Sequence, residues 1–293
     1  MDDFVEQTLG NDALQRLMRM DRGGSSNEKG NRLEDRYATY KIIDSFLKIY
    51  TEEPTLELAH QEKGFVDDIV IKYPALSLKV NYQAKDKQQI SWNELEANFK
   101  CQYVVDTGYH RYKHSKTIAL IAPKEQYTKL STSIPHSISN HTECEHFPND
   151  ESFSRIILDF PPLREALKNV VRKHNDDSHL ETAFAQILGQ WKVSRSSLVK
   201  DIWDNVIANA KPKLFVKPPH IPALEISDRL RRILDTAEKV RYDLSDEALS
   251  IDICGFTYEI SVYDDDYKEK ILMLEKRRPK SPSDFIELWE GMK

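Results

Sequence analysis

Two neighbouring segments, residues 65–73 and 76–85, constrain the fold of this chain more than any other part of its sequence. The first contains three consecutive β-branched residues, Ile69 to Ile71, and then meets Pro74, a pattern that predicts a strand. The second alternates apolar with polar side chains, which predicts a strand with one apolar face. Only a short turn separates the two segments, so we expect a β-hairpin.

Acidic residues open the first of these strands, and a polar triplet closes the second. The acidic residues are Asp67 and Asp68, and the triplet is Gln83, Ala84 and Lys85. In a hairpin these two ends lie side by side. Mg²⁺ prefers oxygen ligands, and a lysine can hold an attacking water or stabilise a pentavalent phosphate. The arrangement therefore predicts hydrolysis of a phosphodiester, with the Asp68 carboxylate and the Ala84 backbone carbonyl as metal ligands.

Strand alternation lets only one of the two neighbouring aspartates face such a site. We choose Asp68, because the strand pattern continues directly from it, and Asp67 is the alternative. For Gln83 and Lys85 the structural alternative is the solvated end of an edge strand, where a lysine is ordinary protection against aggregation.

A helix predicted over residues 32–50 supplies a further acidic group. Glu34 and Asp35 lie in its first turn, where the helix dipole favours acids. Glu34 shares a face with Tyr37 and therefore points inward. The amide oxygen of Gln83 is a weaker ligand than a carboxylate, so we expect Glu34 to complete the metal ligands.

The rest of the first half predicts a mixed sheet flanked by helices, and we place a domain over residues 1–150. Its further predicted elements are a helix over 4–20, a glycine-rich loop over 21–31, a strand over 55–60, a helix capped by Ser91, a strand over 116–123 and a polar loop over 126–150.

The second half, residues 151–293, reads as a mainly α-helical domain with a small hairpin. The predicted helices are 161–173, 179–191, 196–210, 226–242, 264–277 and 283–290, with an extended connector over 211–222 and a hairpin over 250–263. We expect this half to dock protein partners, with simple packing on the first domain as the alternative. The turn at Ser194, Arg195 and Ser196 also fits a helix-turn-helix.

The order of the candidate residues resembles a known nuclease superfamily. Glu34, then Asp68, then Gln83-Ala84-Lys85 is similar to the PD-(D/E)XK nucleases in their QxK form, known in Mrr-type restriction endonucleases. A Gly23-Gly24 pair before the acidic helix and the Asp-Asp-Ile-Val strand also resemble the double-strand DNA endonuclease domain of bacterial anti-phage effectors. The resemblance covers about the first 125 residues and depends on short motifs.

The resemblance implies a restriction-endonuclease-like fold and a metal-dependent endonuclease that hydrolyses double-stranded DNA. It implies Mg²⁺ as the cofactor, with Mn²⁺ as an alternative. By analogy, Asp68 and Lys85 are essential and Gln83 and Glu34 are supporting residues. No familiar cyclic-nucleotide sensor is visible after Asp150, so the chain looks more like a nuclease subunit of a prokaryotic anti-phage or anti-plasmid defence complex.

A complex of the Lamassu type, with an SMC-like ATPase as protein partner, is the analogy that fits this organisation. Two other classes stay open. One is an interaction subunit that keeps the nuclease fold without turnover, and the other is a DNA-binding protein that uses the helix-turn-helix.

Composition sets outer limits on these readings. The net charge of −6 argues against coating nucleic acid through bulk charge, but residues 100–129 carry six Lys or Arg with interleaved tyrosines, a candidate phosphate-contacting surface. The chain lacks a bilayer-length apolar run and a signal-peptide pattern at its start, so we expect a cytoplasmic protein with reduced cysteines and no membrane partner. Zinc is disfavoured, because the ligand-type residues of the polar loop match no common spacing: His136, His141, Cys144 and His146.

Overall fold

The structure is a computed structural model that describes residues 1–23, 28–173, 176–210, 214–216, 226–237, 239–244, 248–253, 256–261 and 266–290. The chain divides into two compact units, Met1–Val216 and Lys217–Lys293. Each unit has its own hydrophobic core. None of the helices in the described residues is both long and apolar enough to cross a membrane.

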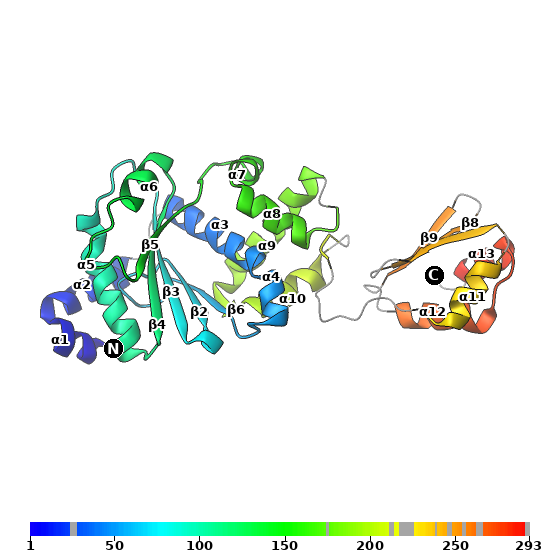
Figure 1. Ribbon diagram of the computed structural model, residues 1–293, viewed down its shortest axis with the longest axis horizontal. Helices are drawn as coiled ribbons and strands as arrows, with labels where there is room; N and C mark the ends of the chain where they lie inside the picture. The colour runs from blue at the N-terminus through cyan, green and yellow to red at the C-terminus, as the bar shows by residue number, and fades with distance from the viewer. Residues whose placement is uncertain are drawn as a thin grey trace. The chain divides into compact units, whose positions relative to one another are not determined.

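A six-stranded mixed sheet forms the centre of the first unit (Figure 1). Its strand order is β5-β4-β3-β2-β1-β6, in which β3, β4 and β5 are parallel and the other neighbours are antiparallel. The strands are β1 (Glu57–His60), β2 (Ile69–Tyr73), β3 (Leu78–Lys85), β4 (His114–Ile121), β5 (Thr142–His146) and β6 (Ser196–Leu198).

Helices cover both faces of this sheet, so the predicted mixed α/β architecture is confirmed. On one face α5 and α6 pack against β4, and on the other α3, α4 and α7 to α10 share a core with β1 to β4. The helices are α1 (Asp2–Leu9), α2 (Asn11–Gly23), α3 (Glu28–Asp44), α4 (Phe46–Thr51), α5 (Trp92–Val104), α6 (Lys124–Ser131), α7 (Phe153–Asp159), α8 (Pro161–Val170), α9 (Asp177–Ser194) and α10 (Val199–Asn209).

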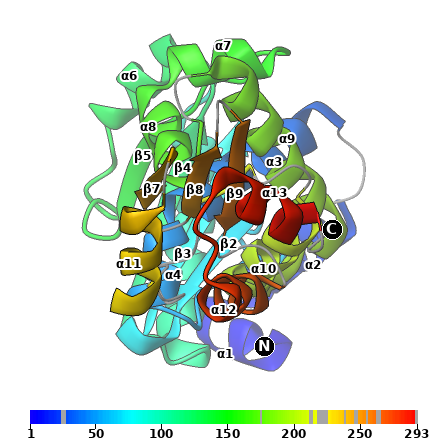
Figure 2. The same ribbon diagram turned by 90° about the vertical axis from the view of Figure 1, so that its right-hand side faces the viewer.

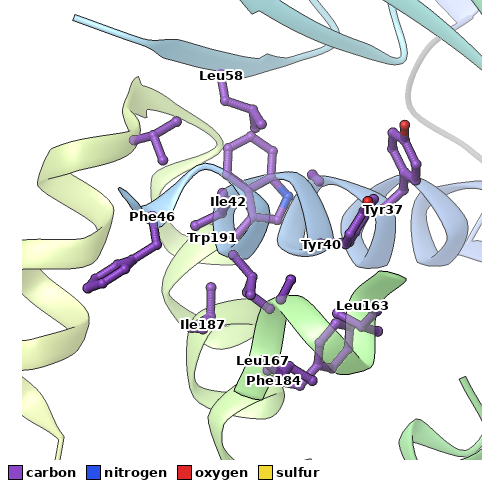
Figure 3. Packing of buried hydrophobic residues seen from close by; sticks show 14 of the residues in the cluster. Tyr37, Tyr40, Ile42, Phe46, Leu58, Leu163, Leu167, Phe184, Ile187 and Trp191 are labelled. Atoms are coloured by element: carbon purple, nitrogen blue, oxygen red, sulfur yellow. The ribbon is translucent and has the colours of Figure 1, made fainter. Parts of the chain in front are cut away.

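The larger core joins parts of the chain that lie far apart in the sequence. Figure 3 shows Trp191 of α9 beside Ile42 of α3 and Leu58 of β1, and all three side chains are buried. Residues after 150 therefore complete the core of the first unit. The unit boundary falls at Val216, whereas the sequence placed a domain boundary at residue 150.

The β2–β3 hairpin forms where the sequence predicts it. Pro74 begins a single 3₁₀ turn, Pro74–Leu76, and Ser77 follows in the left-handed region with φ 48°. Register pairs Ile69 with Tyr82 and Tyr73 with Leu78. The first strand is shorter than predicted and starts at Ile69, because the backbone N–H groups that precede it bind a side chain described below.

Several helices differ from the prediction at single residues. Gly10, with φ 87°, divides the segment predicted as one helix over 4–20 into α1 and α2. Ser45 interrupts the segment predicted as one helix over 32–50. The predicted loop over 21–31 is partly wrong, since α2 runs to Gly23 and α3 starts at Glu28; residues 24–27 lie outside the described residues.

The polar segment over 126–150 is also more ordered than predicted. It contains most of α6 and the whole of β5, which pairs with β4 in parallel. Thr142 is buried and its hydroxyl lies 2.9 Å from that of Thr117 on β4. A strand made of polar residues can join a sheet edge in this way, because side-chain pairing replaces apolar burial.

The predicted helix-turn-helix is wrong. Ser196–Leu198, which should lead into the recognition helix, is instead strand β6 and pairs antiparallel with β1. Val199 and Trp203 of the following helix are buried in the core. This helix packs one face into the core, and its exposed face carries the acidic residues Asp201 and Asp204.

The described residues of the second unit form a three-stranded antiparallel sheet and three helices that share one core (Figure 2). Alternate residues of the central strand, Leu249, Ile251 and Ile253, are buried against these helices. The elements are α11 (Asp228–Thr236), β7 (Val240–Leu244), β8 (Ala248–Ile253), β9 (Phe256–Ser261), α12 (Tyr267–Arg277) and α13 (Pro282–Glu290).

The predicted hairpin over 250–263 corresponds to β8 and β9. The helix predicted over 226–242 ends at Thr236, and its last residues belong to β7 instead. Val240 and Tyr242 alternate with exposed Arg241, which is the period of a strand. Of the predicted connector over 211–222, only residues 214–216 are described, and they bond to the end of α8.

Candidate functional site

The hairpin brings Asp68, Gln83 and Ala84 into direct contact. Beyond the Ile69–Tyr82 pair, the Ala84 backbone N–H donates to Asp68 Oδ2 at 2.7 Å. The Gln83 side-chain amide donates to the same oxygen. Asp68 is thus held by the opposite strand, and its second oxygen takes no part in these two bonds.

Burial and neighbouring acids disfavour ionisation of Asp68. Burial raises its pKa to about 7, and the negative charges of Glu34 and Asp67 contribute in the same direction. The Lys85 ammonium and the Ala84 N–H act in the opposite sense without cancelling the effect. The site therefore holds more negative charge than its own cation compensates.

Asp67 lies in the same electrostatic environment. Its pKa is raised to about 6, mainly by burial and also by Glu34, while Lys85 and His60 act in the opposite direction. Both aspartates thus respond to Glu34 and to Lys85, although these residues belong to a helix and to a different strand. Only Asp68, however, is bonded to the Gln83-Ala84 backbone and side chain.

His60 contacts Glu34, the acidic residue that α3 contributes to the site. Glu34 Oε2 lies 2.6 Å from His60 Nε2, and both side chains are buried. Arg195 lies next to the same ring, with its Nη1 3.3 Å from His60 Nδ1. The Arg195 guanidinium also pairs with Asp35, at 3.0 Å between Nη1 and Oδ1. This chain of contacts connects α3 to the junction of α9 and β6. Because α3 begins at Glu28, Glu34 and Asp35 lie beyond its first turn and not within it, as the sequence predicted.

The sequence missed His60 and Arg195 as neighbours of the site. His60 ends the predicted strand over 55–60, so its position on the sheet could have been noticed. Arg195 carries no such signal, because its approach depends on β6 joining the sheet edge beside β1. Gln83, which the sequence placed among the catalytic residues, donates its side-chain amide N–H to Asp68.

A buried polar network holds the backbone just before the aspartates. Gln102 Oε1 accepts from the N–H groups of Phe65 and Val66, at 2.7 and 3.0 Å. Its amide nitrogen donates to Asp106 Oδ1 at 2.9 Å. Gly64 is required here, because a Cβ at that position would lie 2.7 Å from Gln102 Oε1. The backbone segment that leads into Asp67 and Asp68 is therefore held in place by Gln102 of α5.

The donor set suits a hard cation. The two candidate carboxylates, Asp68 and Glu34, and the Ala84 carbonyl are oxygen ligands of the kind that Mg²⁺ accepts. Burial is the main cause of the raised pKa values of both aspartates, Glu34 adds to it, and a bound cation would favour the charged form of each. Within the described residues, no cluster of three or more His, Cys, Asp or Glu could bind a metal by itself. The set would thus need the backbone carbonyl or water.

The polar-loop residues considered for zinc have other surroundings. The His141 ring stacks on Tyr103 at 4.1 Å between centroids, and His146 Nε2 lies 3.1 Å from the Ala122 carbonyl. Burial lowers the pKa of both imidazoles. It also raises the pKa of the Cys144 thiol to about 11, which opposes the thiolate that zinc binds.

The basic residues between 100 and 129 are exposed, as a phosphate-contacting surface requires. They occupy α5, the approach to β4, β4 itself and α6, and Lys116 pairs with Glu143 at 2.5 Å. The exposed residues are Lys100, Arg111, Lys113, Lys116, Lys124 and Lys129.

Comparisons with known proteins find little. No protein-family model and no curated protein matches the chain. It is similar to the Cap4 SAVED/CARF-domain containing receptor of Acinetobacter baumannii, with a TM-score of 0.37 and 12% identity over 58% of this chain and 45% of that chain. The same receptor with the cyclic trinucleotide 2′3′3′-cAAA gives 0.35 and 13%, over 58% and 44%. The chain thus spans less than half the length of these structures, and similarity this low does not establish a common fold.

Proposed function

We propose that this protein is a divalent-metal-dependent endonuclease that hydrolyses phosphodiester bonds of double-stranded DNA. The observation that supports it most is the grouping of Asp68, Gln83 and Ala84 at one end of the hairpin, within electrostatic range of Glu34 and Lys85. Its order along the chain is the order of the PD-(D/E)XK motif in its QxK form.

Each residue has a distinct role in this proposal. Asp68, Glu34 and the Ala84 carbonyl would hold the cation, which on binding supplies charge neutralisation at the phosphate and acidifies water. Gln83 orients the Asp68 carboxylate through the bond that it donates. Lys85 places a positive charge beside Asp67 and Asp68, where it can orient the attacking water or contact a phosphate oxygen.

The biological setting follows from the same resemblance. We propose that the chain is the nuclease subunit of a prokaryotic anti-phage or anti-plasmid defence complex, with an SMC-like ATPase as a partner. Mg²⁺ is the expected cation, with Mn²⁺ as a substitute. Because residues up to Val216 complete the first unit, the surface available for partners includes the second unit as a whole.

Cleavage of duplex DNA tests this function directly. The full chain, alone and with the products of its neighbouring genes, is incubated with plasmid DNA and Mg²⁺. We expect cleavage that EDTA abolishes, and a loss of about 10²–10³-fold or more in the Lys85→Ala variant. Lys87→Ala is the matched control, because Lys87 is exposed two residues further on.

The same experiment separates the competing class. If the wild-type chain never cuts duplex DNA with its partners present, the protein is an interaction subunit with a nuclease-like hairpin. If Lys85→Ala cuts at the wild-type rate, the hairpin is not the site of hydrolysis.

A further inference from the structure

Three arginines surround a depression on the second unit that the proposed catalytic site does not use. The depression has a volume of about 450 Å³, and the described residues that line it are Arg229, Arg232, Ile233, Thr236 and Arg278. None of these described lining residues is acidic. The three guanidinium groups come from α11 and from the residue that follows α12.

The arginines of α11 lie on one face of the helix. Arg229 and Arg232 are three residues apart and Thr236 follows one turn later, while Leu230 and Leu234 on the opposite face are buried. Like charges at this spacing repel each other, so an anion bound between them would be stabilised.

The Arg232 side chain and the Arg278 backbone are each held by a hydrogen bond. Arg232 Nε donates to the Asp228 carbonyl at 3.2 Å, which leaves the terminal nitrogens of the guanidinium for a ligand. Arg278 closes α12 in the left-handed region with φ 50°, where its N–H donates to the Leu274 carbonyl, and buried Pro279 follows it. Such restraint reduces the entropy lost when a ligand binds.

The acids near this group lie outside the lining of the depression. Asp228 and Asp235 belong to the same helix, and Asp235 accepts from the Tyr242 hydroxyl at 2.8 Å. Within the described part of the chain, Arg229 and Arg278 form no ion pair. The described lining therefore carries three positive charges and no negative charge.

We propose that this arginine cluster, Arg229, Arg232 and Arg278, binds the phosphodiester backbone of duplex DNA, a choice of ligand that rests on the function proposed above. Guanidinium groups match phosphate oxygens in planar, bidentate geometry. All three side chains are exposed, which suits a polymer that crosses the surface, whereas a small ligand is normally enclosed by its pocket. Ile233 supplies an apolar contact for a sugar. The second unit would thus be a DNA-binding unit, a role distinct from hydrolysis.

The salt dependence of DNA binding tests this assignment. The full chain binds a short blunt duplex in EDTA, so that the measurement does not depend on cleavage. The test variant is Arg229→Gln/Arg232→Gln/Arg278→Gln. The control variant, Lys239→Gln/Arg241→Gln/Lys276→Gln, removes the same charge from exposed residues outside the depression.

Each phosphate contact contributes about 0.9 to the slope of log affinity against log salt. We expect the slope of the test variant to fall by about 2.7, and that of the control to stay close to the wild-type value. Equal slopes for the two variants would overturn the proposal. So would binding of inorganic phosphate to wild type without any loss of duplex affinity in the test variant, since the depression would then be a small-anion site.

Discussion

The two ends of the β2–β3 hairpin differ in how their buried charges are compensated. Near the turn, Lys79 is buried, and its ammonium lies 3.0 Å from both Asp106 Oδ1 and Glu62 Oε1. Lys72 lies 2.6 Å from Glu62. Burial by itself would raise the pKa of Glu62, but the two lysines lower it on balance. Each charge at this end has a partner of opposite sign.

At the other end the acids outnumber their cation. Asp68 and Asp67 have pKa values raised to about 7 and about 6, mainly by burial, and Glu34 adds to both shifts. Lys85 lowers both pKa values and His60 lowers that of Asp67, but neither cancels the rise. The contrast teaches which end is structural. Paired buried charges fix the fold, and buried charges of one sign are stable only when a ligand or a proton compensates them.

The largest expected effect on stability comes from removing an acid at the end near the turn, where each buried charge has a partner. Asp106 accepts from four side chains, those of Lys79, Asn81, Gln102 and Ser115. Asp106→Ala leaves the buried Lys79 ammonium with fewer partners, so we expect the free energy of unfolding to fall by about 3–5 kcal/mol. Urea denaturation of the full chain, followed by tryptophan fluorescence, measures it.

A double variant is the control for this effect. Asp106→Leu/Lys79→Met replaces both charges by apolar groups of similar size and should recover the part of the loss that comes from the unpaired Lys79 ammonium, whereas Asn81, Gln102 and Ser115 still lack their Asp106 acceptor. If the double variant is as unstable as Asp106→Ala, the loss does not come from an unpaired lysine.

A smaller effect on stability is expected from Gln102, which connects Asp106 to the backbone just before Asp67. Gln102→Leu removes the acceptor of the Phe65 and Val66 N–H groups. Unmade buried hydrogen bonds cost about 1–3 kcal/mol in stability. Hydrogen exchange should show faster exchange at these two amides than in wild type. Unchanged protection at both would show that Gln102 does not hold the segment before Asp67.

The smallest expected effect is an increase in stability, produced by Asp68→Asn. In the metal-free protein the raised pKa of Asp68 means that the folded state binds its proton more tightly than the unfolded state. Its contribution to stability is therefore present below about pH 4 and is lost as the pH rises towards 7. Asp68→Asn should stabilise the protein in EDTA at pH 8 by on the order of 1 kcal/mol, allowing for solvent screening.

Thermal unfolding at pH 8 and pH 4 checks this prediction. The stabilisation should be present at pH 8 and absent at pH 4, where wild-type Asp68 is protonated. A variant that is less stable than wild type at pH 8 would contradict the claim that this carboxylate is an uncompensated charge.

The sequence was informative where local pattern and tertiary structure agree. The β-branched run, Pro74 and the alternation after it specify the hairpin, and the hairpin by itself places Asp68 beside Gln83. The apolar face of the helix predicted over residues 32–50 indicated that Glu34 points inward. These features depend on neighbouring residues or on one period, so they can be read without knowing the rest of the fold.

The remaining features depend on contacts between distant segments. Neither β6 nor the position of Arg195 just before it could be inferred, because three residues form a strand there only by pairing with β1. Strand β5 consists of polar residues and lacks an apolar period. Gln102 looked like an ordinary helix residue, and its role appears only when the segment before Asp67 folds against α5.

Calorimetric titration of the full chain with Mg²⁺, without DNA, tests the central claim most directly. Because the pKa of Asp68 is about 7, a cation that binds at pH 6 should displace up to about one proton, and the heat should vary with the ionisation enthalpy of the buffer. We expect this proton release to disappear in Asp68→Asn. Binding of Mg²⁺ that releases no proton at pH 6, or that persists unchanged in Asp68→Asn, would contradict the account.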